Sequence, residues 1–436
     1  MWAEPQRERG ELLVYTMTRE GPVGPIRTPR VIECRECGYR FVEPPVVAPG
    51  SRLSCTRCGA TLRHVTADSL RRVLALSIAG LILMATANLF PLITITFGGY
   101  QQTVNLISGA AEFYNRGYLF LAALVLAKTI VLPLVRLGSL TIILLELGSR
   151  APWRHLPVLC RFAVRLQTWA MVEVYVLAGL VAYVKVLPFA KIEVGFGLFA
   201  LAALMVVIIA VSAEFDENAL WEAVEDRGLV QVPAYPEPPL ARCSVCGLVG
   251  SLSAASRPRC ARCGAALFRR RYESIAQCSA LAIAAATLYI PANAFPVMTI
   301  TLLGVDEQTT LFSGVEGLFR ASMWPLALLV FFASVAAPVI RLIVLMLLLL
   351  STKLRLRGRL HDRTVLSRII GRTWRWSMID IFMLSIVVAL VKLGPLATIE
   401  PGIGATCFAA VVLLSMFAAD LFDPRLMWDA AGFNDE

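Results

Sequence analysis

The residues N-L-F-P-L-I-T-I-T at 88–96 recur as N-A-F-P-V-M-T-I-T at 293–301, a separation of 205 residues. Further matches follow along most of the chain at separations of 205 or 207. Self-similarity at a fixed spacing indicates tandem copies of one structural unit. The matched pairs are Ser108/Ser313, Gly109/Gly314, Pro133/Pro338, Arg136/Arg341, Trp169/Trp376, Glu173/Asp380, Lys185/Lys392, Glu193/Glu400, Gly195/Gly402, Gly197/Gly404, Phe215/Phe422 and Asp216/Asp423.

The composition is that of a membrane protein. Of the 436 residues, 57% are hydrophobic and 17% are charged, whereas soluble domains carry about 25% charged residues. The apolar residues form eight blocks near the length of about 20 residues that a helix needs to cross a bilayer. Eight such blocks make buried core helices of a soluble protein a poor alternative. The sequence therefore predicts a polytopic α-helical membrane protein with spans at 73–97, 118–147, 168–189, 196–213, 275–303, 322–351, 376–396 and 402–420.

The basic residues predict the orientation. The linkers 148–167 and 352–375 are rich in arginine, whereas the loops 98–117 and 302–321 are nearly neutral. Short basic loops stay in the cytoplasm, so both linkers and both termini are predicted to lie there. Four spans in each unit make the repeat parallel, with an axis along the membrane normal. Anionic lipid headgroups, rather than nucleic acid, are the expected partners of these linkers.

Eight of the 11 cysteines form C-x-x-C-G motifs, two in each unit. Two such motifs facing each other give a tetrahedral sulfur site typical of structural zinc, and a reducing cytoplasm disfavours disulfides. Each cysteine region spans about 30 residues, too few to fold without a staple. We therefore predict two zinc ribbons, with rubredoxin-like iron and redox-active thiols as alternatives. The ligands are Cys34, Cys37, Cys55 and Cys58, then Cys243, Cys246, Cys260 and Cys263; Cys160, Cys278 and Cys407 are predicted to be packing residues.

Charged residues within the spans are candidates for function because they are costly there. Arg136 follows Pro133 in mid-span and reaches a depth similar to that of Glu173; Arg341 and Asp380 repeat this pattern. One interpretation is a structural ion pair between neighbouring spans. The other is a carboxylate that gains and loses a proton during a transport cycle, in which case neutralising Glu173 or Asp380 abolishes function.

Three lysines also lie within the predicted spans. Lys128 lies in the middle of the second span, and its counterpart is Ala333, so the two units differ there. Lys185 and Lys392 lie near the outer ends of their spans, where a lysine reaches the interface. The sequence thus marks Lys128 as the main departure from the repeat.

The outer ends of spans 1 and 5 alternate with period two after Pro91 and Pro296, which is typical of a strand. The segments 191–193 and 398–400 are candidate partners for these strands. We therefore expect a small β-sheet on the periplasmic face of each unit, where a partner protein could dock.

These patterns divide the chain into five parts. We expect a disordered cytoplasmic tail at 1–30, a first zinc ribbon at 31–65 and a first four-helix membrane domain at 70–220. A second zinc ribbon follows at 240–270, and a second four-helix membrane domain at 274–425.

The chain resembles the paraquat-inducible protein A family of bacterial inner-membrane proteins over residues 31 to 429. The resemblance rests on the C-x-x-C-G motifs and on W-x-M-[VI]-[ED]-[VI]-[FY] at 169–175 and 376–382. It also rests on the N-x-F-P motifs, which contain Asn88 and Pro91 in the first unit and Asn293 and Pro296 in the second. The resemblance implies a partner with MCE domains that forms a periplasmic tunnel, and a role in moving lipids between the two membranes.

The leading hypothesis is therefore an inner-membrane transport component, not an enzyme, that loads or receives lipids for a tunnel. No G-x-x-x-x-G-K-[ST] motif is present, which excludes ATP binding by a P-loop and leaves a proton gradient or a partner as the energy source. A redox protein using the cysteine sites and a scaffold for a periplasmic complex are the alternatives. The histidines, His64, His155 and His361, lie outside the spans and exclude a bis-histidine haem in the membrane.

Overall fold

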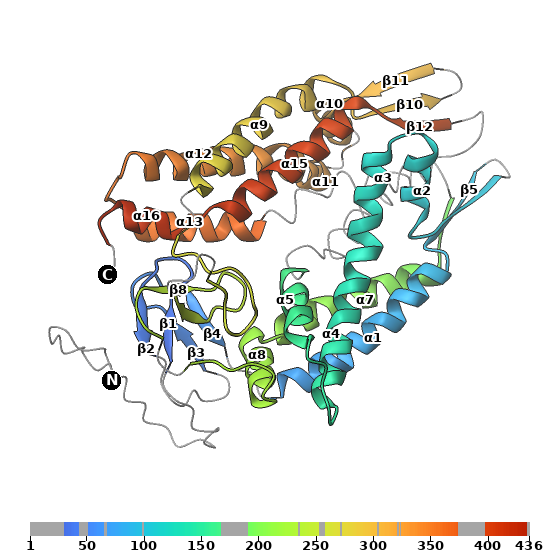
Figure 1. The fold of residues 1–436 in the computed structure, drawn as a ribbon. Coiled ribbons are helices and arrows are strands. Elements are labelled where there is room, and N and C mark those ends of the chain that lie inside the picture. Colours follow the sequence, from blue (N-terminus) through green and yellow to red (C-terminus); the bar gives the residue numbers. More distant parts are fainter. Residues whose placement is uncertain are drawn as a thin grey trace, which may run out of the picture.

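The computed structural model describes most of both units (Figure 1). The described residues are 30–42, 51–64, 68–97, 100–166, 191–233, 236–252, 258–270, 273–302, 305–320, 322, 324–373 and 397–433. Two predicted spans, 168–189 and 376–396, lie outside them. So do the predicted tail, apart from Arg30, and the site residues Glu173, Lys185, Asp380 and Lys392.

Six helices in the described ranges are long and apolar enough to cross a membrane, three in each unit. Large apolar side chains on them point outward; Ile82 is 63% exposed and Leu347 is 55% exposed. Such exposure fits a helix surrounded by lipid, because a water-soluble protein avoids large exposed apolar patches. The six spans are Ser69–Leu89, Leu119–Gly148 and Phe196–Glu214, then Ser274–Ala294, Ser334–Lys353 and Ile403–Leu421.

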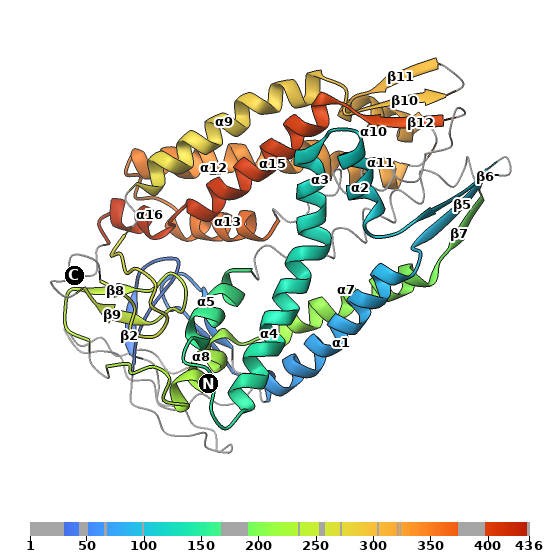
Figure 2. The same cartoon turned by 45° about the vertical axis from the view of Figure 1, so that its right-hand side comes forward.

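The two units contain corresponding elements in the same order. In each, the first and last of the three spans lie side by side, α1 with α7 and α9 with α15 (Figures 1 and 2). The first unit contains α1 (Ser69–Leu89), α2 (Ser108–Asn115), α3 (Leu119–Leu126), α4 (Leu132–Gly148), α5 (Leu156–Leu166), α7 (Phe196–Glu214) and α8 (Glu217–Asp226). The second contains α9 (Ser274–Ala294), α10 (Leu311–Arg320), α11 (Trp324–Phe331), α12 (Ala337–Lys353), α13 (Leu360–Thr373), α15 (Ile403–Leu421) and α16 (Arg425–Ala430).

The second described span of each unit contains one π-helical turn, at Ala127–Val131 and at Phe332–Ala336. Both turns end two residues before a proline, Pro133 or Pro338. Proline lacks a backbone N–H and its ring crowds the preceding turn, so a local change of helix type accommodates it. The π-helical turn was not predicted from the sequence, and it places Lys128 on an irregular segment of backbone.

A three-stranded antiparallel sheet closes one end of each unit. The predicted strand pairs are present: Thr94 lies opposite Glu193, and Thr299 lies opposite Glu400. A third strand in each sheet was not predicted and comes from the neutral loop. The strands are β5 (Ile93–Phe97), β6 (Tyr100–Val104) and β7 (Lys191–Val194), then β10 (Met298–Leu302), β11 (Val305–Thr309) and β12 (Ala397–Pro401).

The cysteine regions lie together at the opposite end of the molecule from the sheets (Figure 2). We call residues 31–64 the first knuckle and residues 240–270 the second knuckle. The repeated Phe-Asp pairs lie beside them, and Asp216 and Asp423 accept hydrogen bonds from the backbone N–H groups of Asn218 and Arg425 at the starts of α8 and α16. The knuckle strands are β1 (Val31–Glu33), β2 (Arg40–Val42), β3 (Arg52–Ser54) and β4 (Thr61–His64), then β8 (Leu240–Arg242) and β9 (Val249–Ser251).

Candidate metal centres and membrane-embedded charges

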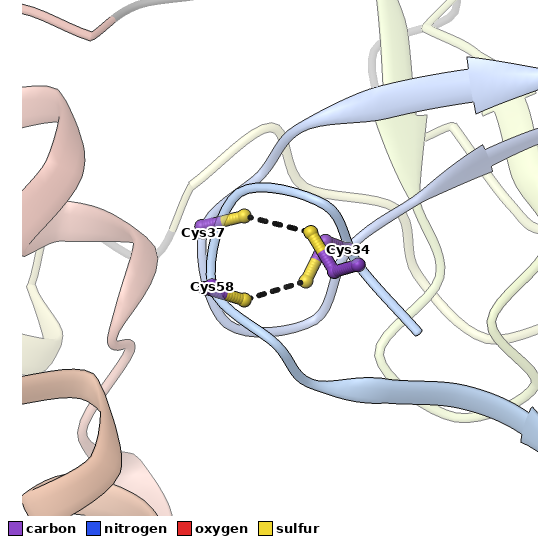
Figure 3. Close-up of side chains that lie close together, drawn as sticks. Cys34, Cys37 and Cys58 are labelled. Atoms are coloured by element: carbon purple, nitrogen blue, oxygen red, sulfur yellow. Dashed lines mark hydrogen bonds between the residues drawn. The ribbon is translucent and has the colours of Figure 1, made fainter. Parts of the chain in front are cut away.

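The first knuckle brings four cysteines together from two hairpins. Cys34 and Cys37 lie between β1 and β2, and Cys55 and Cys58 lie between β3 and β4. The Sγ atoms of Cys34 and Cys58 are 3.6 Å apart, as are those of Cys37 and Cys55 (Figure 3). All four side chains are buried, and their sulfur atoms lie within 4.8 Å of one another.

The second knuckle has the same geometry. The Sγ atoms of Cys243 and Cys263 are 3.5 Å apart, and those of Cys246 and Cys260 are 3.4 Å apart. Zinc–sulfur bonds of about 2.3 Å in a tetrahedron place sulfurs about 3.8 Å apart. Both donor sets therefore fit a metal ion of the size of zinc with little adjustment. Hydrogen bonds among the thiols lower the pKa of Cys55 and of Cys243 and raise the pKa of Cys37 and of Cys246, so the geometry of the sulfur atoms, and not these shifts, supports a metal site.

The glycine after each motif closes the turn. Gly38 and Gly59 have φ angles of +74° and +67°, in the left-handed region that side chains other than glycine rarely adopt. Their backbone N–H groups donate to the carbonyl oxygens of Cys34 and Cys55 at 3.1 and 2.8 Å. The C-x-x-C-G spacing thus produces the knuckle through local geometry.

Buried charge surrounds the first knuckle. The Glu33 side chain is completely buried and accepts hydrogen bonds from Arg40, Arg270 and Arg425 at 3.0 to 3.2 Å. At the corresponding position of the second knuckle, before the first cysteine, the residue is Arg242. Its Nε atom is buried without a hydrogen-bond partner, and burial lowers the pKa of Arg242 to about 10.

The two predicted membrane arginines are buried and bind hydroxyl groups. Arg136 donates to the Ser212 Oγ at 3.0 Å, and Arg341 donates to the Ser415 Oγ at 3.2 Å. Both serines lie on the last span of their unit, and sequence reasoning missed both. They are not repeat equivalents, because a separation of 207 pairs Ser212 with Ala419. The feature of the sequence that could have indicated these partners is a serine in an otherwise apolar span.

Lys128 lies on the π-helical turn, and only 2% of it is exposed. The adjacent Thr129 is also buried and donates its hydroxyl to the Val125 carbonyl oxygen. The predicted pairing of Arg136 with Glu173 and of Arg341 with Asp380 stays a prediction, because both carboxylates lie outside the described residues. The same holds for Lys185 and Lys392.

The N-x-F-P motifs join the first and last spans of each unit. Asn88 and Asn293 donate side-chain hydrogen bonds to the carbonyl oxygens of Met84 and Tyr289, one turn earlier in the helix. The carbonyl oxygen of Pro91 accepts the N–H of Gly197 at 2.9 Å, and that of Pro296 accepts the N–H of Gly404 at 3.1 Å. A side chain on these glycines, or on Gly195 and Gly402, would collide with the proline carbonyl. The repeated glycines therefore permit a close backbone contact.

The family assignment follows from the whole repeated pattern. The sequence profile of the family described as paraquat-inducible protein A matches residues 70–225 and again residues 275–432. The chain belongs to this family. Its membrane units each match the family pattern once, which agrees with the internal repeat seen in the sequence.

Curated relatives align over nearly the whole chain. The intermembrane transport protein PqiA of Escherichia coli K12 is 30% identical over 403 residues, which cover 91% of this chain and 95% of PqiA. Lipophilic envelope-spanning tunnel protein A of the same strain is 31% identical over 404 residues, 91% of each chain. A probable intermembrane transport protein of Haemophilus influenzae is 25% identical, covering 92% of this chain and 96% of the relative. No solved structure matches the chain.

Proposed function

We propose that this protein is the inner-membrane component of an intermembrane lipid transport system and passes lipids to or from a periplasmic tunnel protein with MCE domains. The observation that carries the proposal is the similarity, over 91% of the chain, to proteins named for intermembrane transport and for an envelope-spanning tunnel. Six membrane-compatible helices in the described part of the chain support it.

The two ends of the molecule suit different tasks. In the proposed orientation the knuckles and the basic linkers lie in the cytoplasm, and the two sheets face the periplasm. The outer sheet strands β6, β7, β11 and β12 have one edge each that pairs with no described strand, and an open strand edge can pair with an incoming strand. These edges are our proposed dock for the tunnel protein.

Photo-crosslinking can distinguish transport from a scaffold role. A photoreactive residue at Thr129, which is buried beside Lys128, should capture phospholipid in native membranes. The same residue at Ile142, which is 45% exposed on α4, reports the lipid that surrounds any membrane helix. Adducts from both positions support transport, whereas adducts from Ile142 alone indicate a scaffold.

We also propose that zinc occupies both cysteine sites. The four sulfur donors of each site would hold the ion, and the ion would hold together a fold of about 30 residues that lacks its own core. Elemental analysis of the purified protein should give two zinc ions per chain and no visible absorbance. Iron with visible absorbance would overturn this assignment and favour the redox alternative.

A further inference from the structure

The knuckles contact the opposite units reciprocally. Arg368 on α13 of the second unit donates to the carbonyl oxygen of Cys58 in the first knuckle at 3.3 Å. Arg161 on α5 of the first unit donates to the carbonyl oxygen of Cys263 in the second knuckle at 3.4 Å. The two arginines are 207 residues apart and the two cysteines are 205 residues apart. These are the separations that relate the two units, so the same contact forms twice, each time across the units.

A second pair of contacts crosses in the same way. Arg57 and Arg262 occupy the same place within C-T-R-C and C-A-R-C. The guanidinium of Arg57 lies 4.9 Å from the ring centroid of Trp428 on α16, in the second unit. The guanidinium of Arg262 donates to Glu225 on α8, in the first unit, at 2.5 Å. Each knuckle thus reaches the terminal helix of the unit to which it does not belong.

Each knuckle also stays attached to its own unit. Arg63 pairs with Glu222 on α8 at 2.6 Å, and its equivalent Arg270 pairs with Asp429 on α16 at 2.6 Å. Each knuckle therefore contacts its own terminal helix and also two helices of the other unit, and so bridges the two units. Figure 1 shows the knuckle strands between α8 and α16.

The crossed contacts that occur in both knuckles involve the second cysteine motif. The first knuckle adds two ion pairs from around its first motif, Glu33 with Arg425 and Glu36 with Arg368. Cys58 and Cys263 supply the contacted carbonyl groups, and Arg57 and Arg262 lie directly before them in the chain. A bound ion would fix this turn, because a preformed metal site rarely persists without its metal. A site with four thiolates and one divalent ion has a net charge of about −2. This negative charge attracts the positively charged guanidinium groups around the site.

We propose that each metal-filled knuckle is a docking surface for the opposite unit. Metal in the first knuckle holds α13 and α16 of the second unit, and metal in the second knuckle holds α5 and α8 of the first unit. The two ions therefore couple the halves of the protein at the knuckle end. This inference rests on metal occupancy of the cysteine sites and does not depend on lipid transport.

Hydrogen exchange measured by mass spectrometry on the whole protein tests whether each metal site stabilises the opposite unit. Cys58→Ser should speed exchange about tenfold or more in residues 360–373 and leave 156–166 near the unsubstituted rate, because lost tertiary contacts raise local opening. Cys263→Ser should give the opposite pattern. Faster exchange confined to each knuckle's own unit, or equal effects on both segments, would overturn the proposal. Elemental analysis of the same samples shows whether one ion was lost.

A milder set of variants keeps both metal sites intact. Arg161→Ala should retain two ions and speed exchange in residues 258–267 of the second knuckle, and Arg368→Ala should do the same in residues 51–64 of the first. Arg165→Ala is the matched control, because Arg165 is exposed on the same helix as Arg161. Identical exchange in Arg161→Ala and Arg165→Ala would contradict the docking role of Arg161.

Discussion

The two knuckles share the geometry of their cysteines but differ in the charge placed before the first one. The first has Glu33, fully buried among three arginines, and the second has Arg242, whose Nε atom finds no hydrogen-bond partner. The cysteine spacing is thus common to both sites, whereas the surrounding charges are particular to each. The first knuckle therefore has buried ion pairs to three separate parts of the chain, for which the second knuckle has no equivalent at Arg242.

The largest expected effect comes from Glu33→Ala. This change removes the buried carboxylate that three arginines share, and breaking a buried ion pair typically costs about 3–5 kcal/mol. Arg270 and Arg425 keep Asp429 and Asp423 as partners, so the loss should fall near the lower end of that range. Arg242→Met should cost far less, because it breaks no described ion pair and removes a buried Nε atom that has no hydrogen-bond partner. Thermal unfolding of both variants in detergent measures the contrast. Equal losses of stability would show that the two knuckles are held alike.

The close glycine–proline contacts that join the first and last spans should contribute equally to stability in both units. Gly195→Ala and Gly402→Ala each force a Cβ atom against a proline carbonyl group, and overpacking of this kind costs about 2 kcal/mol. Gly138→Ala is the control, because a Cβ there meets open space. Thermal unfolding in detergent measures both effects. A loss of stability in only one of the two glycine variants would show that the two contacts are not equivalent.

The smallest expected effect concerns the arginine–hydroxyl pairs. Ser415→Ala and Ser212→Ala each remove one hydrogen bond to a buried arginine, which should cost about 1.5 kcal/mol, the low end for a charged partner, and less where water can replace the hydroxyl group. Ser415 is 1% exposed, whereas Ser212 is partly exposed, so Ser415→Ala should cost more. A larger loss for Ser212→Ala would contradict the burial argument.

Much of the candidate site could be predicted from the sequence. The cysteine ligand sets and the strand segments depend on spacing within a few residues, and local geometry then brings each hairpin together. The Ser212 and Ser415 partners could not be predicted, because each lies more than 70 residues from its arginine. The basic linkers were expected to face lipid headgroups, yet Arg161 and Arg368 contact the knuckles.

The membrane class, the repeat and the two cysteine sites could be recognised in the amino-acid chain alone, because apolar length and C-x-x-C-G spacing act locally. Which unit each knuckle contacts became known only from the packing of the folded protein. Residue spacing cannot predict which unit a knuckle contacts, since Arg368 lies 310 residues from Cys58. The physical reason is that the crossed contacts join groups brought together by the packing of two units, and either pairing would satisfy the same local rules.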